Sequence, residues 1–120
     1  MYSKEEIIEK LNESLAFSKM AVPVIYQDLI KTKEGHGELN DCDCRLLSLK
    51  KENQDKEIET FVEVRWIASG KFRYIDYNIN QAWETTATTP EDEKEAVEAV
   101  AEVISKLSQF EDFTVTRLGE

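Results

Sequence analysis

The residue types that could bind a metal ion gather in one short segment. His36, Cys42 and Cys44 lie within nine residues, and Asp41 or Asp43 could supply a fourth ligand. Only one residue separates the two cysteines, whereas the paired cysteines of zinc modules are usually two residues apart, and no second pair follows. We interpret the segment as a loop that leads into a strand with two reduced thiols. We therefore predict no metal ion and no other cofactor.

The sequence also contains no recognisable catalytic motif. Nucleophilic catalysis requires a base beside the nucleophile, and the single histidine lies between Gly35 and Gly37, without a motif that sets it against a serine or cysteine. The four glycines cannot build a dinucleotide-binding loop or a Walker loop. Carboxylates are so numerous that no pair stands out as an acid and base couple. We predict that the protein is not an enzyme.

The charge balance excludes several classes of partner. Twenty-five acidic residues against 15 basic ones give a net charge of −10, which disfavours both a nucleic-acid binder and an anionic membrane surface. No apolar stretch reaches the roughly 18 residues of a spanning helix, and the first residues resemble the start of a helix rather than a signal peptide. Together with the reduced thiols, these features predict a cytoplasmic protein. A larger protein with a basic surface is the partner that fits the charge.

Hydrophobic periodicity predicts an α+β fold in a single domain over 1–120. An antiparallel sheet of three to four strands should carry its helices on one face. After the first helix the chain either kinks at Pro23 or forms a short helix over 23–31, and 81–88 is an irregular strand or a long crossover. The expected elements are a helix over 4–19, a meander over 44–51, 57–68 and 71–79, a helix over 90–109 and, as a candidate fourth strand, 113–118.

Two turns determine the predicted faces of the sheet. Ser69-Gly70 is a two-residue connection of the kind that closes a tight hairpin, so Val64 should face Ile75. A four-residue turn after the first strand would set Leu49 against Ile58. The core face would then carry Leu47, Leu49, Ile58, Val62, Val64, Trp66, Ile75, Tyr77 and Ile79.

A second set of apolar side chains falls on the other face of this predicted sheet. If nothing covers them, Leu46, Phe61, Ile67, Phe72 and Tyr74 form a contiguous patch. Such a patch on a small protein commonly marks a surface for a partner or for self-association, so a homo-oligomer could form through this outer face. The alternative is that 81–88 or the first helix folds over it.

An acidic stripe and one tryptophan complete the candidate surface. The stripe on the last helix is either a solvated face, placed well at the positive end of the helix dipole, or a negative surface that enters a basic cleft. Trp83 is either a core plug at the end of the sheet or an exposed anchor. The residues that we expect to bind a partner are Phe61, Ile67, Phe72, Tyr74, Trp83, Glu91, Glu95, Glu98 and Glu102.

Three hypotheses for the function follow. We favour a small acidic interaction module that inhibits or antagonises a larger enzyme in a stoichiometric complex. In size, charge and architecture the chain resembles the small acidic inhibitors that phages and mobile elements encode against host defence, and the immunity proteins that neutralise toxins, although no sequence motif carries this likeness. The alternatives are a self-assembling subunit and a protein that binds, sequesters or transforms a small nucleotide-like molecule near Arg73, Tyr74, Asn78 and Trp83.

Overall fold

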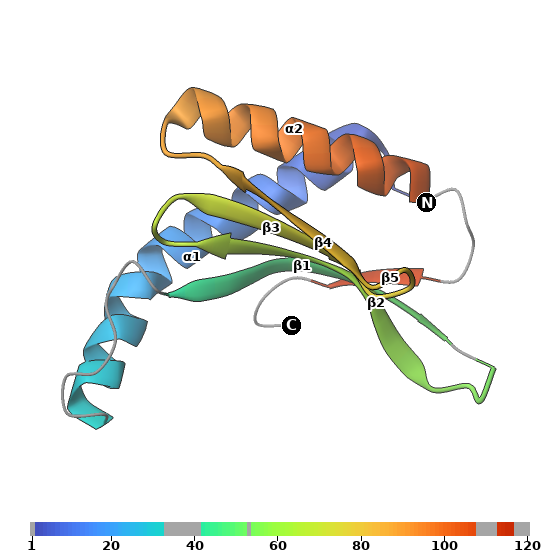
Figure 1. Ribbon diagram of the computed structural model, residues 1–120, viewed down its shortest axis with the longest axis horizontal. Helices are drawn as coiled ribbons and strands as arrows, with labels where there is room; N and C mark the ends of the chain where they lie inside the picture. Colours follow the sequence, from blue (N-terminus) through green and yellow to red (C-terminus); the bar gives the residue numbers. More distant parts are fainter. Residues whose placement is uncertain (1, 33–41, 53, 108–112, 117–120) are drawn as a thin grey trace.

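Two helices lie on one face of a five-stranded antiparallel sheet (Figure 1). The computed structural model describes residues 2–32, 42–52, 54–107 and 113–116, with the backbone course alone over 24–32 and 113–116. This arrangement confirms the predicted α+β fold. The elements in chain order are α1 (Lys4–Thr32), β1 (Asp43–Glu52), β2 (Ile58–Ile67), β3 (Lys71–Asp76), β4 (Gln81–Thr86), α2 (Pro90–Leu107) and β5 (Phe113–Thr116).

The strand order is β4-β3-β2-β1-β5. Strands β1 to β4 form an antiparallel meander, and β5 pairs with the other side of β1. Of the two alternatives for 81–88, the strand is correct, since β4 pairs regularly with β3 along its whole length. β4 is therefore one edge of the sheet.

The hairpin between β2 and β3 differs from the prediction by one residue. Val64 pairs with Tyr74, and Ile67 is the last residue of β2 to pair, so the connection has three residues and not two. Gly70 closes this connection with a φ of 101°, and its N–H donates to the carbonyl of Ile67 at 2.9 Å. Three-residue hairpin loops commonly end in this way, because glycine adopts positive φ without strain.

This shift turns the side chains of β3 to the opposite face of the sheet. Phe72 and Tyr74 are buried, with 1% and 4% of their surface exposed, and they face the helices. Ile75 lies half-buried on the other face, while Tyr77 and Ile79 are exposed in the loop after β3. The prediction that Ile75, Tyr77 and Ile79 face the core is therefore wrong. Of the two alternatives for Phe72 and Tyr74, the bare patch is wrong, because both side chains are covered.

The pairing of β1 with β2 also departs from the prediction. Leu49 pairs with Val62, whereas its predicted partner Ile58 is 65% exposed at the start of β2. The register shifts at two points, and the extra residues there are Leu46 and Phe61. A bulge residue falls out of the simple alternation of faces. Both side chains are buried, so neither belongs to a bare outer patch.

The core lies between the sheet and the two helices. Its sheet side confirms part of the predicted core face, since Leu47, Leu49, Val62, Val64 and Trp66 are all buried. The helices contribute the residues at three- and four-residue spacing, chiefly Ile7, Leu11, Leu15, Val97, Val100 and Ile104. The amphipathic periodicity of both helices therefore has its expected cause, which is burial of one stripe against a sheet.

Both helices begin where their capping residues predict. The N–H of Glu6 donates to the hydroxyl of Ser3 at 3.1 Å, and the N–H of Asp92 donates to the hydroxyl of Thr89 at 3.1 Å. Of the two alternatives at Pro23, a single continuous helix is correct, because α1 continues through Pro23 as far as Thr32. Residues 23–31 are thus an extension of the first helix and not a separate one.

Candidate functional site

The path of the chain after β4 brings α2 beside the edge of the sheet (Figure 1). Only three residues separate β4 from α2, and the first of them, Ala87, is buried and donates its N–H to the carbonyl of Gly70 at 2.7 Å. α2 then runs antiparallel to α1, because Lys19 pairs with Glu93 at 2.6 Å and Lys4 pairs with Glu102 at 3.1 Å. These contacts hold α2 between α1 and the edge strand.

A groove of about 260 Å³ lies between β4 and α2, and we call it the β4–α2 groove. Trp83 forms part of its wall from β4, 38% exposed, and its ring stacks on Tyr74 with centroids 5.4 Å apart. Asp92 and Glu95 contribute carboxylates from α2. The remaining lining residues are Thr85, Thr86, Ala96 and Ala99. An exposed aromatic surface therefore adjoins negative charge in one concave site.

Four acidic residues of α2 are exposed and form no ion pair with a described residue: Glu91, Asp92, Glu95 and Glu98. Glu102 differs from them, because a hydrogen bond and the charge of Lys4, with a further contribution from Lys106, lower its pKa. Its charge is partly balanced within the protein. These unpaired carboxylates thus lie in the first two to three turns of α2, and two of them, Asp92 and Glu95, line the groove.

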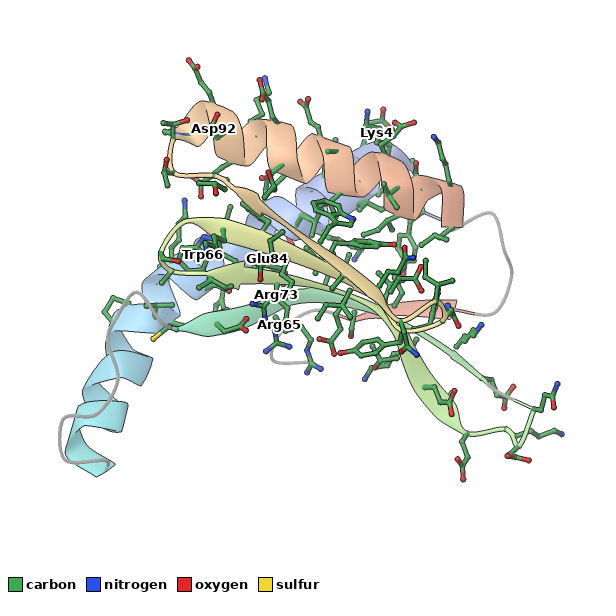
Figure 2. The ribbon with its side chains drawn as sticks, viewed as in Figure 1. Lys4, Arg65, Trp66, Arg73, Glu84 and Asp92 are labelled. Carbon is green, nitrogen blue, oxygen red and sulfur yellow. The ribbon has the colours of Figure 1, made fainter. Side chains whose placement is uncertain are left out.

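A second cluster of functional groups lies on the open face of the sheet, opposite the helices. Arg45, Arg65 and Arg73 are register partners across β1, β2 and β3, and we call them the arginine row. They are three of the four arginines in the sequence. Figure 2 shows Arg65 and Arg73 pointing away from the helix layer. Adjacent strands are only about 5 Å apart, so these like charges would repel if nothing stood between them.

Three carboxylates neutralise the row. Arg65 binds Asp43 and Glu63, both at 2.9 Å, and Arg73 binds Glu84 at 2.6 Å. Partial burial alone would lower the pKa of Arg65, but its hydrogen bonds to Asp43 and Glu63 outweigh that effect and raise the pKa. Among the described residues, the one ion pair of Arg45 is a longer contact, at 3.8 Å, to Glu63. The cluster therefore acts as a cross-strand network with no net charge.

Glu63 is the most buried member of this network, with 9% of its side chain exposed. Tyr77, in the loop after β3, approaches it as well. Desolvation, followed by the charge of Glu63 and a hydrogen bond to it, raises the pKa of Tyr77. A carboxylate at this depth requires its basic partners, which explains why the arginines gather on this face.

The structure brings together only part of the predicted partner-binding set. Trp83 and Glu95 line the groove, while Glu91 and Glu98 lie exposed on the same helix. Glu102 is paired with lysines. The predicted outer-face members do not form a patch, since Phe61, Phe72 and Tyr74 are buried and Ile67 is half-buried. The outer apolar surface proposed for self-association is therefore absent from the described residues.

The small-molecule site suggested by Arg73, Tyr74, Asn78 and Trp83 is not assembled either. Arg73 lies on the open face of the sheet, Tyr74 and Trp83 lie on the helix face, and Asn78 is exposed in the loop between β3 and β4.

The residues that sequence patterns missed are Asp92 and the arginine row. The single-residue register shift conceals the row, because the predicted register pairs Arg73 with Trp66.

The candidate metal ligands are described only in part, since His36 lies outside the described residues. Cys42 and Cys44 are buried free thiols at the start of β1. Burial is the main cause that raises the pKa of Cys44. Among the described ranges, no group of three histidine, cysteine or acidic side chains is positioned to hold a metal ion.

Two further findings concern membrane crossing and similarity to known proteins. Neither described helix combines the length and the apolar character that crossing a membrane requires. No family model matches the chain, and neither a curated protein nor a solved structure matches it.

Proposed function

We propose that this protein is an acidic interaction module that binds a basic surface of a larger protein and inhibits or antagonises it as a one-to-one complex. The observation that carries the proposal is the position of Trp83, exposed in the β4–α2 groove beside Asp92 and Glu95. Phage-encoded antagonists of host defence enzymes and immunity proteins are the kinds of protein with this role. The partner and the protein are both cytoplasmic in this proposal.

An exposed tryptophan in a groove is a common anchor of protein interfaces. Its large ring buries much apolar area at a low entropic cost, and it is among the residue types that dominate binding energy. Trp83 stacks on the buried ring of Tyr74, and this contact favours one orientation of the indole before any partner arrives. A pre-ordered side chain loses little further freedom on binding.

The unpaired acids of α2 supply the electrostatic part of the proposal. Asp92 and Glu95 line the groove, and Glu91 and Glu98 are exposed on the same helix; all four are among the acidic residues that give the chain its net charge of −10. Complementary charge accelerates encounter with a basic partner and disfavours acidic competitors. The same carboxylates would repel nucleic acid, so we expect the protein to bind the basic surface directly.

The experiment requires a partner captured from cells that naturally make the protein. Its association rate constant is then measured at low and high salt for the wild type and for Asp92→Asn/Glu95→Gln, which removes both carboxylates that line the groove. We expect roughly a tenfold slower association at high salt, since the Debye length falls to a few ångströms. The double variant should associate more slowly at low salt and depend less on salt.

The matched control is Glu5→Gln/Glu9→Gln on α1, which changes the net charge equally at exposed positions away from the groove. It should retain most of the wild-type rate. An association rate that does not change with salt, or that falls equally in both double variants, contradicts a role for the acids of α2. Loss of the partner's activity in an equimolar mixture would establish inhibition, and undiminished activity would contradict it.

A further inference from the structure

The outer edge of β4 offers backbone hydrogen-bonding groups. β4 is the first strand of the sheet, and β3 is its only described neighbour. In an antiparallel pair, residues that bond to the neighbouring strand alternate with residues whose N–H and C=O groups point away from it. The N–H of Ala87 donates to the carbonyl of Gly70, so Ala87 belongs to the bonded set. The register is constant along β4, so the N–H and C=O groups of Ala82, Glu84 and Thr86 point away from β3.

This edge lacks the features by which proteins usually prevent edge pairing. Prolines, lysines and bulges are the common protections, and β4 contains none of them. Its only charged side chain, Glu84, is turned back over the sheet, where it binds Arg73 at 2.6 Å. Tryptophan and threonine, which favour extended backbone, make up half of the strand.

The groove lies along the same edge, on the helix side. Trp83 and Thr85 pair with Tyr74 and Phe72, so their side chains face the helix layer, where Glu95 lies above them. An added strand would direct every second side chain into this groove, between the indole and the carboxylates. Lysine and arginine suit both surroundings, because they pair with carboxylates and stack on aromatic faces.

We propose that β4 accepts an extended basic segment of the partner as a sixth strand, with lysine or arginine at alternate positions in the β4–α2 groove. The inference rests on the proposed function and specifies how the partner is held. Main-chain hydrogen bonds along the edge give affinity, and the groove selects the basic side chains.

Charge argues against a second copy of this chain as the occupant. Antiparallel pairing of two β4 strands about a two-fold axis would bring both α2 helices to the same side of a continuous sheet. Asp92 and Glu95 of each copy would then approach those of the other. Neither residue has an ion pair with a described residue to offset that repulsion.

The test uses the full chain and a synthetic probe, the capped peptide Thr-Lys-Val-Lys-Val-Lys-Thr. Amide hydrogen exchange, followed by NMR, reports which backbone groups it covers. The amides of Ala82, Glu84 and Thr86 should become at least about tenfold more protected, while those of Trp83 and Thr85 change little because they already bond to β3. A dimer, detected by light scattering with the same amides protected, would instead identify a second copy and overturn the proposal.

Three controls make the result specific. In an antiparallel added strand with its lysines in the groove, the N–H groups of the two valines would face β4. Their N-methylation should abolish protection, while N-methylation of two lysines should not. A peptide with glutamate in place of lysine should not bind. Glu95→Gln should weaken binding several-fold, because Glu95 lines the β4–α2 groove. Glu98 lines a different groove, between α1 and α2, so Glu98→Gln should have little effect.

The failures of the two proposals can be told apart. If the captured partner binds with the expected salt dependence but leaves Ala82, Glu84 and Thr86 unprotected, strand addition is wrong and the proposed function stands. No protection by the lysine peptide at millimolar concentration, or equal loss with both N-methylated peptides, also overturns strand addition. If no partner is captured while the peptide protects the edge, the proposed function fails instead.

Discussion

Tyr74 and Trp83 are direct partners across β3 and β4, and their rings stack at 5.4 Å with an angle of 18° between the planes. Tyr74 is 4% exposed, so the indole of Trp83 forms part of the lid over the core as well as a wall of the groove. One side chain therefore serves both stability and the proposed interface. This dual position determines how variants of Trp83 have to be interpreted.

Replacement of Trp83 by alanine should destabilise the fold moderately. Loss of the stack and exposure of Tyr74 should lower the free energy of unfolding by about 1–2 kcal/mol. Urea unfolding followed by circular dichroism measures this quantity. Trp83→Phe retains a ring over Tyr74 and should lose less than half as much. Equal stability of the alanine variant and the wild type would show that the stack contributes nothing.

The three-residue loop between β2 and β3 makes Gly70 a sensitive position. Its φ of 101° is unfavourable for any residue with a Cβ, and a Cβ would lie 2.8 Å from Cγ2 of Thr88. Gly70→Ala should lower the free energy of unfolding by about 1–2 kcal/mol. Ser69→Ala, at the exposed neighbouring position, should change it by less than about 0.5 kcal/mol. Thermal unfolding of the two variants, compared side by side, checks the register.

The arginines of the row should contribute unequally to the stability of the fold. Arg65 makes two contacts at 2.9 Å, one of them to the buried Glu63, whereas Arg45 makes one contact at 3.8 Å. Arg65→Met should lower the free energy of unfolding by about 1–2 kcal/mol, because a buried carboxylate loses its main partner. Arg45→Met should cost less than about 1 kcal/mol. Urea denaturation would contradict this account if Arg45→Met were the more damaging variant.

Alkaline pH should weaken the fold through Tyr74. Burial, with the charge of Asp76 as a smaller cause, raises the pKa of Tyr74 to about 12. In the unfolded chain tyrosine loses its proton near pH 10, so the folded state holds more protons over this window. The free energy of unfolding should therefore fall between about pH 10 and pH 12, by at most about 1.4 kcal/mol per pH unit. Tyr74→Phe should fall less steeply in urea unfolding series across this range, and an identical slope would contradict the raised pKa.

Helices were the most predictable part of the fold. Ser3 and Thr89 mark both helix starts, and the spacing of Ile7, Leu11 and Leu15 fits only a helix with one buried face. The hairpin between β2 and β3 was also expected at the correct place. Local signals of this kind depend on a few neighbouring residues, so they can be recognised in a single chain.

Strand registers could not be predicted in the same way. β3 has apolar residues on both faces, and the loop sequence fits either two or three residues, so the pattern alone supports both registers. The bulges at Leu46 and Phe61 have no sequence signal, yet they reassign two large side chains. The groove could not be predicted from the sequence either. Trp83 could be recognised as a candidate anchor, but its proximity to Asp92 depends on how α2 returns beside β4.

The most direct measurement of the central claim is quantitative capture from lysate of the native cells with three purified baits. These are the wild type, the groove variant Trp83→Ala/Glu95→Gln and the control Glu5→Gln/Glu9→Gln, each checked for folding by circular dichroism. We expect a protein with a basic surface to be captured in equimolar amounts by the wild type and the control, and at least about tenfold less by the groove variant. Equal capture of that protein by all three baits would contradict binding through the β4–α2 groove.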